Sequence, residues 1–313
     1  MAWVPYSRGL HEVATGCWAW FEPPGTWGLS NSGVVRIGNE TLVVDTQNDV
    51  RRAGDLRAAV DRVAGSDGIG TVVNTHDDGD HWFGNLRFED SRIIATTAAA
   101  SGMRSVPIDP RRLVEVGRDG SALQRWSRWR AEFYDYEGWR PVYPTETFDG
   151  STTVKLGDGV VEVYEVGPAH TRGDAIVHVP EAGVVFTGDI LFHRATPVVW
   201  AGPVSNYIAA CDVVLGLEPE VVVPGHGPVA RTSGVRETRS YLVRLLEHTL
   251  RCIEAGAPAE VAYRTFDPAE YRLWPHASRA YQSIRAIYAE HEPDLPGPSW
   301  AESMEIVLED DAS

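Results

Sequence analysis

The chain has 313 residues, which is enough to bury a large core either as one α/β unit or as two domains. Its hydrophobic fraction of 43% and charged fraction of 23% are ordinary for a soluble globular protein. The formal net charge of −16 argues against nucleic acid or an anionic membrane as the main partner.

The first third of the chain alternates strand and helix patterns. Residues 12–46 are typical of a β-meander, because glycines separate short apolar segments. Residues 51–64 carry apolar side chains, including Leu56 and Val60, on one face at helical spacing. Residues 71–74 then form a short buried strand. This strand–helix–strand order predicts a layered α/β architecture.

Residues 103–147 interrupt this alternation with two helical stretches rich in arginine and aromatic residues. Beyond them, further strands are expected at 160–166, 175–179, 184–187 and 220–223, and a helix at 207–217.

After about residue 233 the pattern becomes helical, with 238–255 and 277–290 as the clearest segments. We therefore predict a core over 1–232, in which 103–147 is an insertion near the functional site. Residues 233–313 form a helical extension of the same domain, with a frayed tail from Pro293.

Four short motifs carry histidine and aspartate, and each follows an apolar run, so each falls where a strand has just ended. Loops of this kind meet at one edge of a sheet, where ligands collect. The remaining histidines, apart from His193, are interpreted as structural. The motifs are Thr75-His76-Asp77-Asp78-Gly79-Asp80-His81, Gly167-Pro168-Ala169-His170, Thr187-Gly188-Asp189 and Pro224-Gly225-His226-Gly227.

Imidazole nitrogen and carboxylate oxygen suit zinc and the other first-row divalent metals. Two such ions can share a bridging hydroxide, because they lower the pKa of bound water toward neutrality. Asp189, the last residue of its motif, is well placed to bridge. The candidate metal ligands are His76, Asp78, Asp80, His81, His170, Asp189 and His226.

These motifs resemble those of the metallo-β-lactamase fold superfamily over roughly residues 10–230. The resemblance implies an αβ/βα sandwich of two mixed sheets with flanking helices. It implies one metal on His76, position 78 and His170. It implies a second metal on Asp80, His81 and His226, with Asp189 between the two. Asp45, at an earlier strand end, would support the loop that carries the ligands.

Position 78 departs from the family's His-x-His-x-Asp-His motif, because it holds Asp78 where the pattern has histidine. Three aspartates and a hydroxide would then balance the charge of two divalent ions, and oxygen-rich ligation favours iron or manganese over zinc. Zinc is still the first expectation. Since aspartate is short, a single filled site with Asp78 outside it is an open alternative.

The sequence gives weaker evidence about the substrate than about the metal site. Residues 25–33, 167–171 and 196–200 resemble thioesterase- or cyclase-like hydrolases of aromatic polyketide pathways. Aromatic side chains near a metal site can stack on a planar substrate, or they can simply pack the segment onto the body. The candidate substrate-binding residues are Trp126, Trp129, Tyr134 and Trp200.

Two residues are candidates for catalysis. Asp80 is expected to act as well as to bind metal, and His193, shortly after Asp189, to donate a proton or hydrogen bond to a developing oxyanion. The segment from Arg104 to Arg130 contains seven arginines and only three acidic residues. This surplus would suit an acidic carrier protein or a coenzyme A phosphate, or it is solvated helix surface.

The first hypothesis is a metal-dependent hydrolase in which a metal-bound hydroxide attacks an ester, thioester or lactone. The second is a di-iron oxygenase or redox enzyme, and the third a degenerate metal-binding member without catalysis. The expected partner is a small-molecule or carrier-bound acyl substrate, with a homodimer left open.

The predicted location is the cytoplasm. The three cysteines are far apart without metal-ligand spacing, which fits a reducing compartment. The start lacks the features of a signal peptide, and no apolar run reaches the ~18 residues of a membrane helix.

Overall fold

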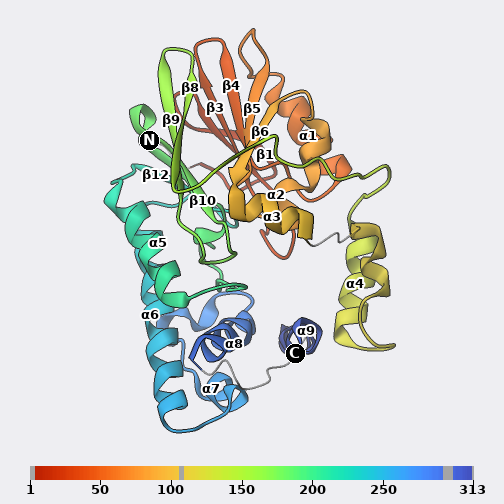
Figure 1. Cartoon of the computed structure of the whole chain (residues 1–313), viewed down its shortest axis with the longest axis vertical. Coiled ribbons are helices and arrows are strands. Elements are labelled where there is room, and N and C mark those ends of the chain that lie inside the picture. Colours follow the sequence, from red (N-terminus) through yellow and green to blue (C-terminus); the bar gives the residue numbers. More distant parts are fainter. Residues whose placement is uncertain (1–3, 106–108, 292–298, 312–313) are drawn as a thin grey trace.

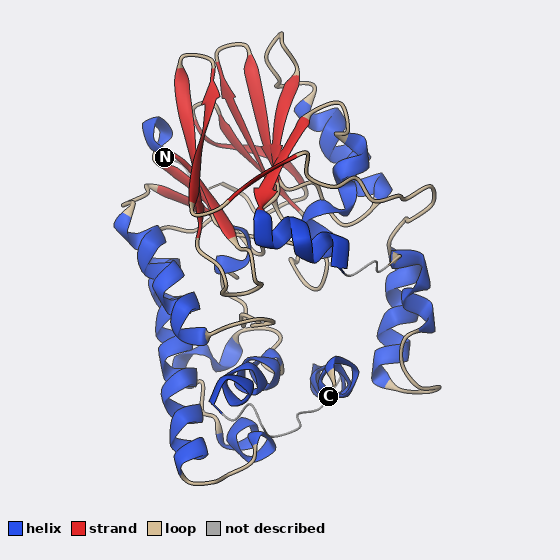
Figure 2. Cartoon of the chain, in the orientation of Figure 1, coloured by secondary structure: helices blue, strands red, loops and turns tan. Residues whose placement is uncertain are grey.

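The computed structural model describes residues 4–105, 109–291 and 299–311, without the side chains of 113–115. Two β-sheets pack face to face, and helices cover the outer faces (Figure 1). Figure 2 shows the strands gathered at one end of the molecule and the C-terminal helices at the other. The predicted α/β sandwich of two mixed sheets with flanking helices is confirmed.

The larger sheet has seven strands in chain order. Its first four strands pair antiparallel, and the strands from β4 onward pair parallel. The strands are β1 (Gly9–Ala14), β2 (Cys17–Phe21), β3 (Ser32–Ile37), β4 (Glu40–Val44), β5 (Ile69–Val73), β6 (Arg92–Thr96) and β7 (Glu146–Phe148).

The smaller sheet has five strands in the order β12-β11-β10-β9-β8. Only β11 and β12 run parallel. The strands are β8 (Ser151–Leu156), β9 (Gly159–Glu165), β10 (Ala175–Val179), β11 (Val184–Phe186) and β12 (Val221–Val223).

The main core lies between the sheets and follows the alternation of the strands. Val35 and Leu42 of the larger sheet are fully buried in one cluster with Val163 and Phe186 of the smaller sheet. Each such side chain contributes roughly 1.5–3 kcal/mol when buried. Gly33 allows this approach, since a Cβ there would lie 2.4 Å from the ring of Phe186.

Helices cover both outer faces of the sandwich. Leu56 and Val60 of α1 pack on the outer face of the larger sheet, and α5 and α6 cover the smaller one. Asp49 caps α1, because its carboxylate accepts a hydrogen bond from the Arg52 amide at 2.7 Å. These helices are α1 (Val50–Val60), α2 (Gly79–Trp82), α3 (Thr97–Ser105), α5 (Val204–Gly216) and α6 (Thr232–Glu254).

The other helices stand beyond the sandwich (Figure 1). They are α4 (Ala122–Phe133), α7 (Ala259–Thr265), α8 (Arg279–His291) and α9 (Trp300–Asp311). Short 3-10 helices are η1 (Phe83–Arg87), η2 (Pro110–Glu115), η3 (Pro180–Ala182), η4 (Gly188–Ile190) and η5 (Ala269–Leu273). Within the described residues, no helix has the length and apolar character to span a membrane.

The tail is not frayed where it is described, contrary to the sequence-based prediction. Residues 300–311 form α9, which packs against α4 through Met304 and Leu308 and also contacts α8. The Glu305 carboxylate accepts hydrogen bonds from the amides of Ala122 and Leu123 at 2.6 and 2.9 Å, so it caps the start of α4. The acidic composition of this segment led to the wrong prediction, because its few apolar side chains lie on one face of the helix. The rest of the predicted tail lies outside the described residues.

Candidate metal centre

All four histidine- and aspartate-bearing motifs meet at one edge of the sandwich. His76 follows β5, and Asp80 and His81 lie in the short helix α2. His170, Asp189 and His226 follow β9, β11 and β12. Both sheets therefore contribute. As the sequence predicted, each motif follows a strand, although Asp80 and His81 lie in α2 and Asp189 lies in the 3-10 helix η4 rather than on open loops.

The first group consists of His76, Asp78, His170 and Asp189, whose potential ligand atoms lie within 4.8 Å of one another. His170 Nε2 lies 3.0 Å from Asp78 Oδ2 and 3.3 Å from Asp189 Oδ2. His76 Nε2 lies 3.8 Å from Asp189 Oδ2. Two imidazoles and two carboxylates thus face one small volume.

The second group consists of Asp80, His81 and His226. His226 Nε2 lies 3.3 Å from Asp80 Oδ2, and His81 Nε2 lies 3.8 Å from the same oxygen. Asp189 reaches this group too, with Oδ1 3.2 Å from His81 Nε2 and Oδ2 3.4 Å from His226 Nε2. Asp189 accordingly lies between the two groups, as the resemblance implied.

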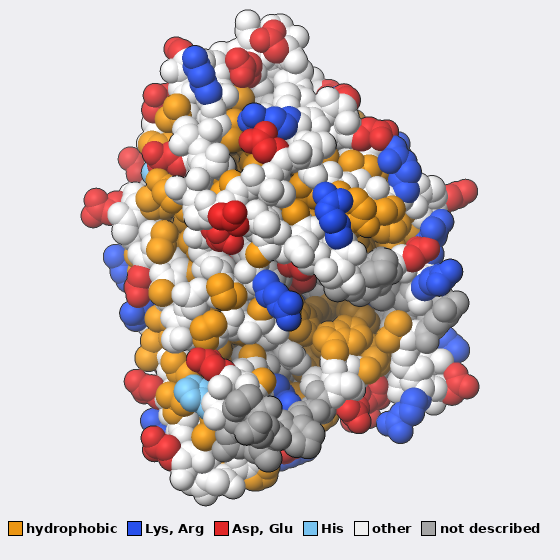
Figure 3. Space-filling view, viewed as in Figure 1, with side chains coloured by type: hydrophobic (Ala, Val, Ile, Leu, Met, Phe, Trp, Pro, Cys, Tyr) orange, Lys and Arg blue, Asp and Glu red, His pale blue; other side chains and the backbone are white. Residues whose placement is uncertain are grey.

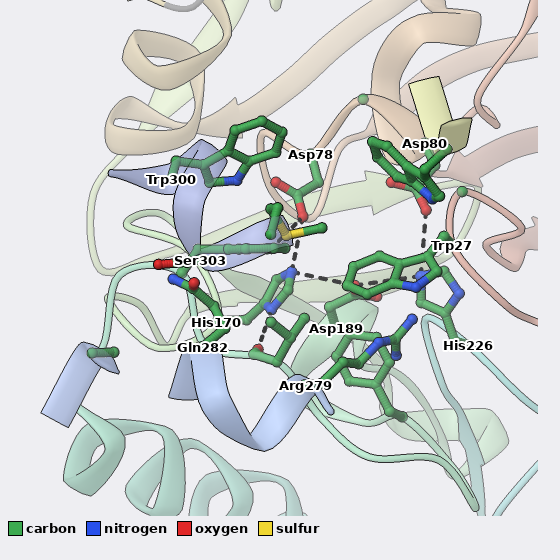
Figure 4. A pocket seen from close by; sticks show the side chains of 18 of the residues that line it. Trp27, Asp78, Asp80, His170, Asp189, His226, Arg279, Gln282, Trp300 and Ser303 are labelled. Carbon is green, nitrogen blue, oxygen red and sulfur yellow. Dashed lines mark hydrogen bonds and ion pairs between the residues drawn. The ribbon is translucent and has the colours of Figure 1, made fainter. Parts of the chain in front are cut away.

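Asp78 reaches the site despite its short side chain. Its Oδ2 faces His170 Nε2 (Figure 4). The same oxygen accepts a hydrogen bond from Trp200 Nε1 at 3.1 Å. The alternative in which Asp78 lies outside the site therefore does not describe this geometry. Whether Asp78 binds metal stays a prediction.

Each imidazole is held from behind, so that its Nε2 faces the site. His170 Nδ1 donates to the Val198 carbonyl at 2.7 Å, and His226 Nδ1 to the Gly25 carbonyl at 3.1 Å. Such partners fix the orientation and tautomer of metal-binding histidines. The loops around residues 25 and 198 are two of the stretches that suggested a polyketide-type substrate. Their visible role is to hold histidines.

Asp45 lies behind the loop that carries the ligands. Its Oδ2 lies 2.8 Å from His81 Nδ1, and its Oδ1 accepts the Thr75 amide at 2.8 Å. Burial raises the pKa of Asp45, while His81 and Thr75 oppose that rise. Asp45 also adopts φ +60°, a left-handed conformation that aims its carboxylate at both partners.

The side chains present fit a divalent metal. Three of their buried atoms, His76 Nε2, His81 Nε2 and Asp189 Oδ1, have no hydrogen-bond partner. Leaving buried polar atoms unpaired costs about 1–3 kcal/mol each, and a cation shared among them offsets this cost. Burial, with the nearby charge of His81, lowers the pKa of His76 to about 3. The neighbouring aspartates instead raise the pKa of His81, His170 and His226 against the effect of burial, so a metal that binds there has to displace protons from these imidazoles.

A cavity of about 540 Å³ opens over these groups. Asp78, Asp80, His170, Asp189 and His226 lie at its metal end, and Figure 3 shows a largely hydrophobic hollow between α3, α4 and α9. Helices α4, α8 and α9 supply what we call the helical wall, which consists of Trp126, Arg130, Arg279, Gln282, Arg285, Ala286, Ala289, Trp300, Ser303 and Met304.

Two of the four predicted substrate-binding residues line the cavity, namely Trp126 and Trp200. Trp129 does not, because it is 38% exposed on the outer side of α4 and stacks on Phe133 at 5.0 Å. Tyr134 is buried instead, and its hydroxyl donates to the Trp27 carbonyl at 2.7 Å. For Trp129 and Tyr134, packing is the better interpretation.

His193 is also placed away from the cavity. Its ring packs beside Gly234 of α6, and its Nδ1 lies 2.8 Å from the Pro228 carbonyl. Its backbone amide donates to the His226 carbonyl at 3.0 Å. The predicted oxyanion role is therefore replaced by a structural one, in which His193 braces the loop that carries His226.

Sequence reasoning missed the lining residues of α8 and α9. In α8 the lining positions Arg279, Gln282, Ala286 and Ala289 recur at helical spacing. This stripe of polar and small residues is a visible signal, because the apolar residues Ile284, Ile287 and Tyr288 of the helix lie outside it. Helical periodicity alone does not reveal which part of the molecule such a stripe faces.

The fold and the clustered histidines and aspartates together define a metal-dependent hydrolase class. A family model described as "Metallo-beta-lactamase superfamily" matches residues 25–226, so the chain belongs to that superfamily. The match includes every residue of the two groups, and the predicted class of enzyme is confirmed.

Similar proteins agree with this assignment. The chain is 27% identical over 212 residues to an acyl-coenzyme A thioesterase MBLAC2 from Gallus gallus, covering 63% of this chain and 72% of the relative. A metallo-beta-lactamase from Pontibacter korlensis shares the fold with a TM-score of 0.55 and 18% identity, covering 75% of this chain and 99% of that one.

A larger neighbour, the inverting sec-alkylsulfatase Pisa1 from a Pseudomonas species, has a TM-score of 0.66 and 14% identity. The match covers 93% of this chain and 52% of that chain. At these identities the solved structures support the fold alone.

Proposed function

We propose that this protein hydrolyses acyl thioesters, with metal ions held by the two groups at the base of the cavity. The observation that carries the proposal is the convergence of four histidines and three aspartates beneath an apolar cavity. The similarity to an acyl-coenzyme A thioesterase supports a thioester substrate.

The first group would hold one ion and the second group another, with Asp189 shared. Divalent metals supply Lewis acidity and activate water as a nucleophile near neutral pH. Within the protein, His81 and His226 oppose the effect of burial and keep the pKa of Asp80 below its usual range. The Asp80 carboxylate is therefore ionised, and it can orient the attacking water by accepting a hydrogen bond.

The cavity also favours a thioester over an oxygen ester. Among the described lining residues, no side chain outside the metal groups titrates near neutral pH, because the remaining charged ones are arginines. A leaving alcohol needs a proton donor, whereas a thiolate, whose conjugate acid has a pKa of ~8.5, departs without one.

The test is hydrolysis of S-hexanoyl-N-acetylcysteamine beside the matching oxygen ester. We expect faster cleavage of the thioester, loss of activity in a chelator, and recovery on addition of zinc. His291→Ala, at the exposed end of α8, serves as a histidine-removal control that retains activity. Thioester hydrolysis that persists in fully chelated protein contradicts the proposal.

Asp78 favours a second candidate, an iron enzyme that consumes oxygen. Its carboxylate lies 3.0 Å from His170 Nε2, so the two groups together contain three carboxylates. Oxygen-rich sites prefer iron or manganese more than nitrogen-rich sites do. Elemental analysis of protein purified without added metal, together with an oxygen electrode, separates the candidates. Bound zinc and no oxygen uptake exclude the iron enzyme.

A carrier-bound acyl substrate, a homodimer, a cytoplasmic location and the division at residue 232 remain proposals. The polyketide substrate has weaker support than before, since the loops near residues 25 and 198 hold His226 and His170.

A further inference from the structure

A buried guanidinium lies in the cavity without an acidic partner. Arg279, the first residue of α8, is 1% exposed and lines the cavity. Its Nη1 donates to the Thr196 carbonyl at 3.2 Å, and its Nε has no partner. Among the described residues, no carboxylate lies within ion-pair distance of it.

This arrangement is costly for the free protein. Burial lowers the pKa of Arg279 to about 10, although Asp311, Asp189 and Asp80 oppose that change. The side chain therefore stays charged at neutral pH. Asp311 is engaged elsewhere, with His276 Nδ1 at 3.0 Å and the Ser278 hydroxyl. An unpaired buried charge destabilises a fold, so a ligand that pairs with it explains its presence.

Other lining groups point to the same kind of ligand. Arg130 and Arg285 each have an unpartnered Nε, and neither forms an ion pair within the described chain. Both are less deeply buried than Arg279. Arg130 does donate to the Asn48 and Tyr136 side chains, both of them uncharged. In a protein with a net charge of −16, three arginines on one cavity wall without an acidic partner among the described residues make a local site for an anion.

Arg279 is close to the reacting end of the cavity. Its guanidinium carbon lies 4.0 Å from the centre of the Trp27 ring (Figure 4). The same carbon lies 5.3 Å from the centre of the Phe192 ring. Phe192 stacks on His226 at 5.1 Å, so Arg279 is no more than about 10 Å from that imidazole. A short acyl chain spans this interval, since an extended chain advances ~3.5 Å for every three bonds.

We propose that Arg279 binds a carboxylate at the far end of the acyl group, so that the enzyme prefers short dicarboxylic monothioesters to uncharged acyl thioesters. This inference rests on the proposed thioesterase function. Arg279 makes a planar, bidentate fit to a carboxylate, and its stacking on Trp27 holds the fork in place. Arg279 is here a specificity-determining residue and takes no part in bond cleavage.

The first experiment uses the unmodified, metal-loaded protein. Succinyl, glutaryl and adipyl thioesters of N-acetylcysteamine are compared with the same compounds carrying a methyl ester on the distal carboxyl. We expect at least a tenfold higher kcat/KM for one or more of the free acids, mainly through KM. Equal kcat/KM for the acids and their methyl esters overturns the inference while leaving the hydrolase intact.

Variants then assign the preference to a residue. Arg279→Gln should remove the discrimination, and Arg279→Lys should restore part of it. Arg251→Gln, on the exposed side of α6, removes the same charge and should change nothing. If Arg279→Gln fails to fold, the comparison of Arg279→Lys with the unmodified protein still tests whether the preference for the free acids depends on Arg279. Discrimination that survives in folded Arg279→Gln, or that depends on Arg130 or Arg285 instead, contradicts the assignment.

Two further arms separate the alternatives. The same acids offered as coenzyme A thioesters show whether phosphate is the anion, because a preference seen only with coenzyme A esters refutes a carboxylate site. If no thioester is cleaved, the proposed function fails, and binding decides the inference by itself. Calorimetry should then show tighter binding of glutarate than of monomethyl glutarate, and equal affinities would refute the site.

Discussion

The metal end and the helical wall of the cavity are built differently. At the metal end, buried imidazoles such as His170 and His226 are held from behind by backbone carbonyls on short strand-end loops. On the helical wall, Arg279 and Trp126 leave polar atoms without partners. The metal end also contains buried atoms without a hydrogen-bond partner, but those atoms face the space between the ligands, and the imidazoles are fixed from the other side. A rigid end of this kind suits bond cleavage. A wall with unpaired groups suits recognition, since the ligand supplies the missing partners.

The two regions come only partly from the same segment of the chain, because Trp126 and Arg130 of the helical wall lie within the superfamily match and the rest of the wall does not. The superfamily match spans residues 25–226 and so contains the whole metal end. Arg279, Gln282 and Trp300 lie beyond it. Family membership therefore describes the reaction class, whereas substrate choice is expected to depend on α8 and α9, which are outside the shared segment.

The comparison predicts the largest effects at the metal end. His76→Ala and His226→Ala should each reduce thioester hydrolysis to background, because each removes a nitrogen from one of the two groups. The measurements are kcat/KM, metal content and circular dichroism. A folded, metal-free variant that remains active would refute the assignment of the site.

Backbone crowding gives the second prediction. A Cβ at Gly225 would lie 1.9 Å from Asp189 Oδ1 and 2.7 Å from the backbone of Gly188. Gly225→Ala should therefore displace Asp189 and lower activity by roughly 10²-fold, with a stability loss of roughly 1–3 kcal/mol. Gly216→Ala is the matched control, because a Cβ there meets no atom within 4 Å. Equal activity of the two variants would show that Asp189 is not held tightly.

Sequence patterns predicted the metal end because its signals are local. A short apolar run followed by His or Asp predicts both a strand and the position at which that strand ends, as at His76 and Asp189. The sandwich itself follows from the same runs. The sequence alone does not show that the short side chain of Asp78 reaches the site, because this depends on how close the segment after β9 brings His170.

The helical wall was harder to predict because it depends on long-range packing. Trp126 and Trp129 look equivalent in the sequence, yet only Trp126 faces the cavity. The face of α4 is set by contact with α9, whose acidic composition suggested a frayed tail. His193 has the right spacing from Asp189 for a catalytic role, but its ring turns toward α6.

A third prediction concerns the support behind the metal end. Asp45→Asn keeps the size of the side chain but removes the charge that faces His81 Nδ1 at 2.8 Å. Loss of such a partner typically weakens metal binding 10–100-fold. Competition with a chelator measures this change. Asp61→Asn, which disrupts only an exposed pair with Arg57, is the control and should leave metal affinity unchanged.

The smallest effects are expected on α4, where two tryptophans test which helix face forms the wall. Trp126 lines the cavity and meets Trp27 edge to face at a centroid distance of 6.3 Å. Trp126→Ala should raise KM for an apolar acyl thioester roughly 3- to 10-fold with little change in kcat, because it removes contact area and not a reacting group. Trp129→Ala removes the same side chain from the outer face and should stay within about twofold. If both variants raise KM equally, the substrate contacts both faces of α4, and the prediction that only the Trp126 face belongs to the helical wall is wrong.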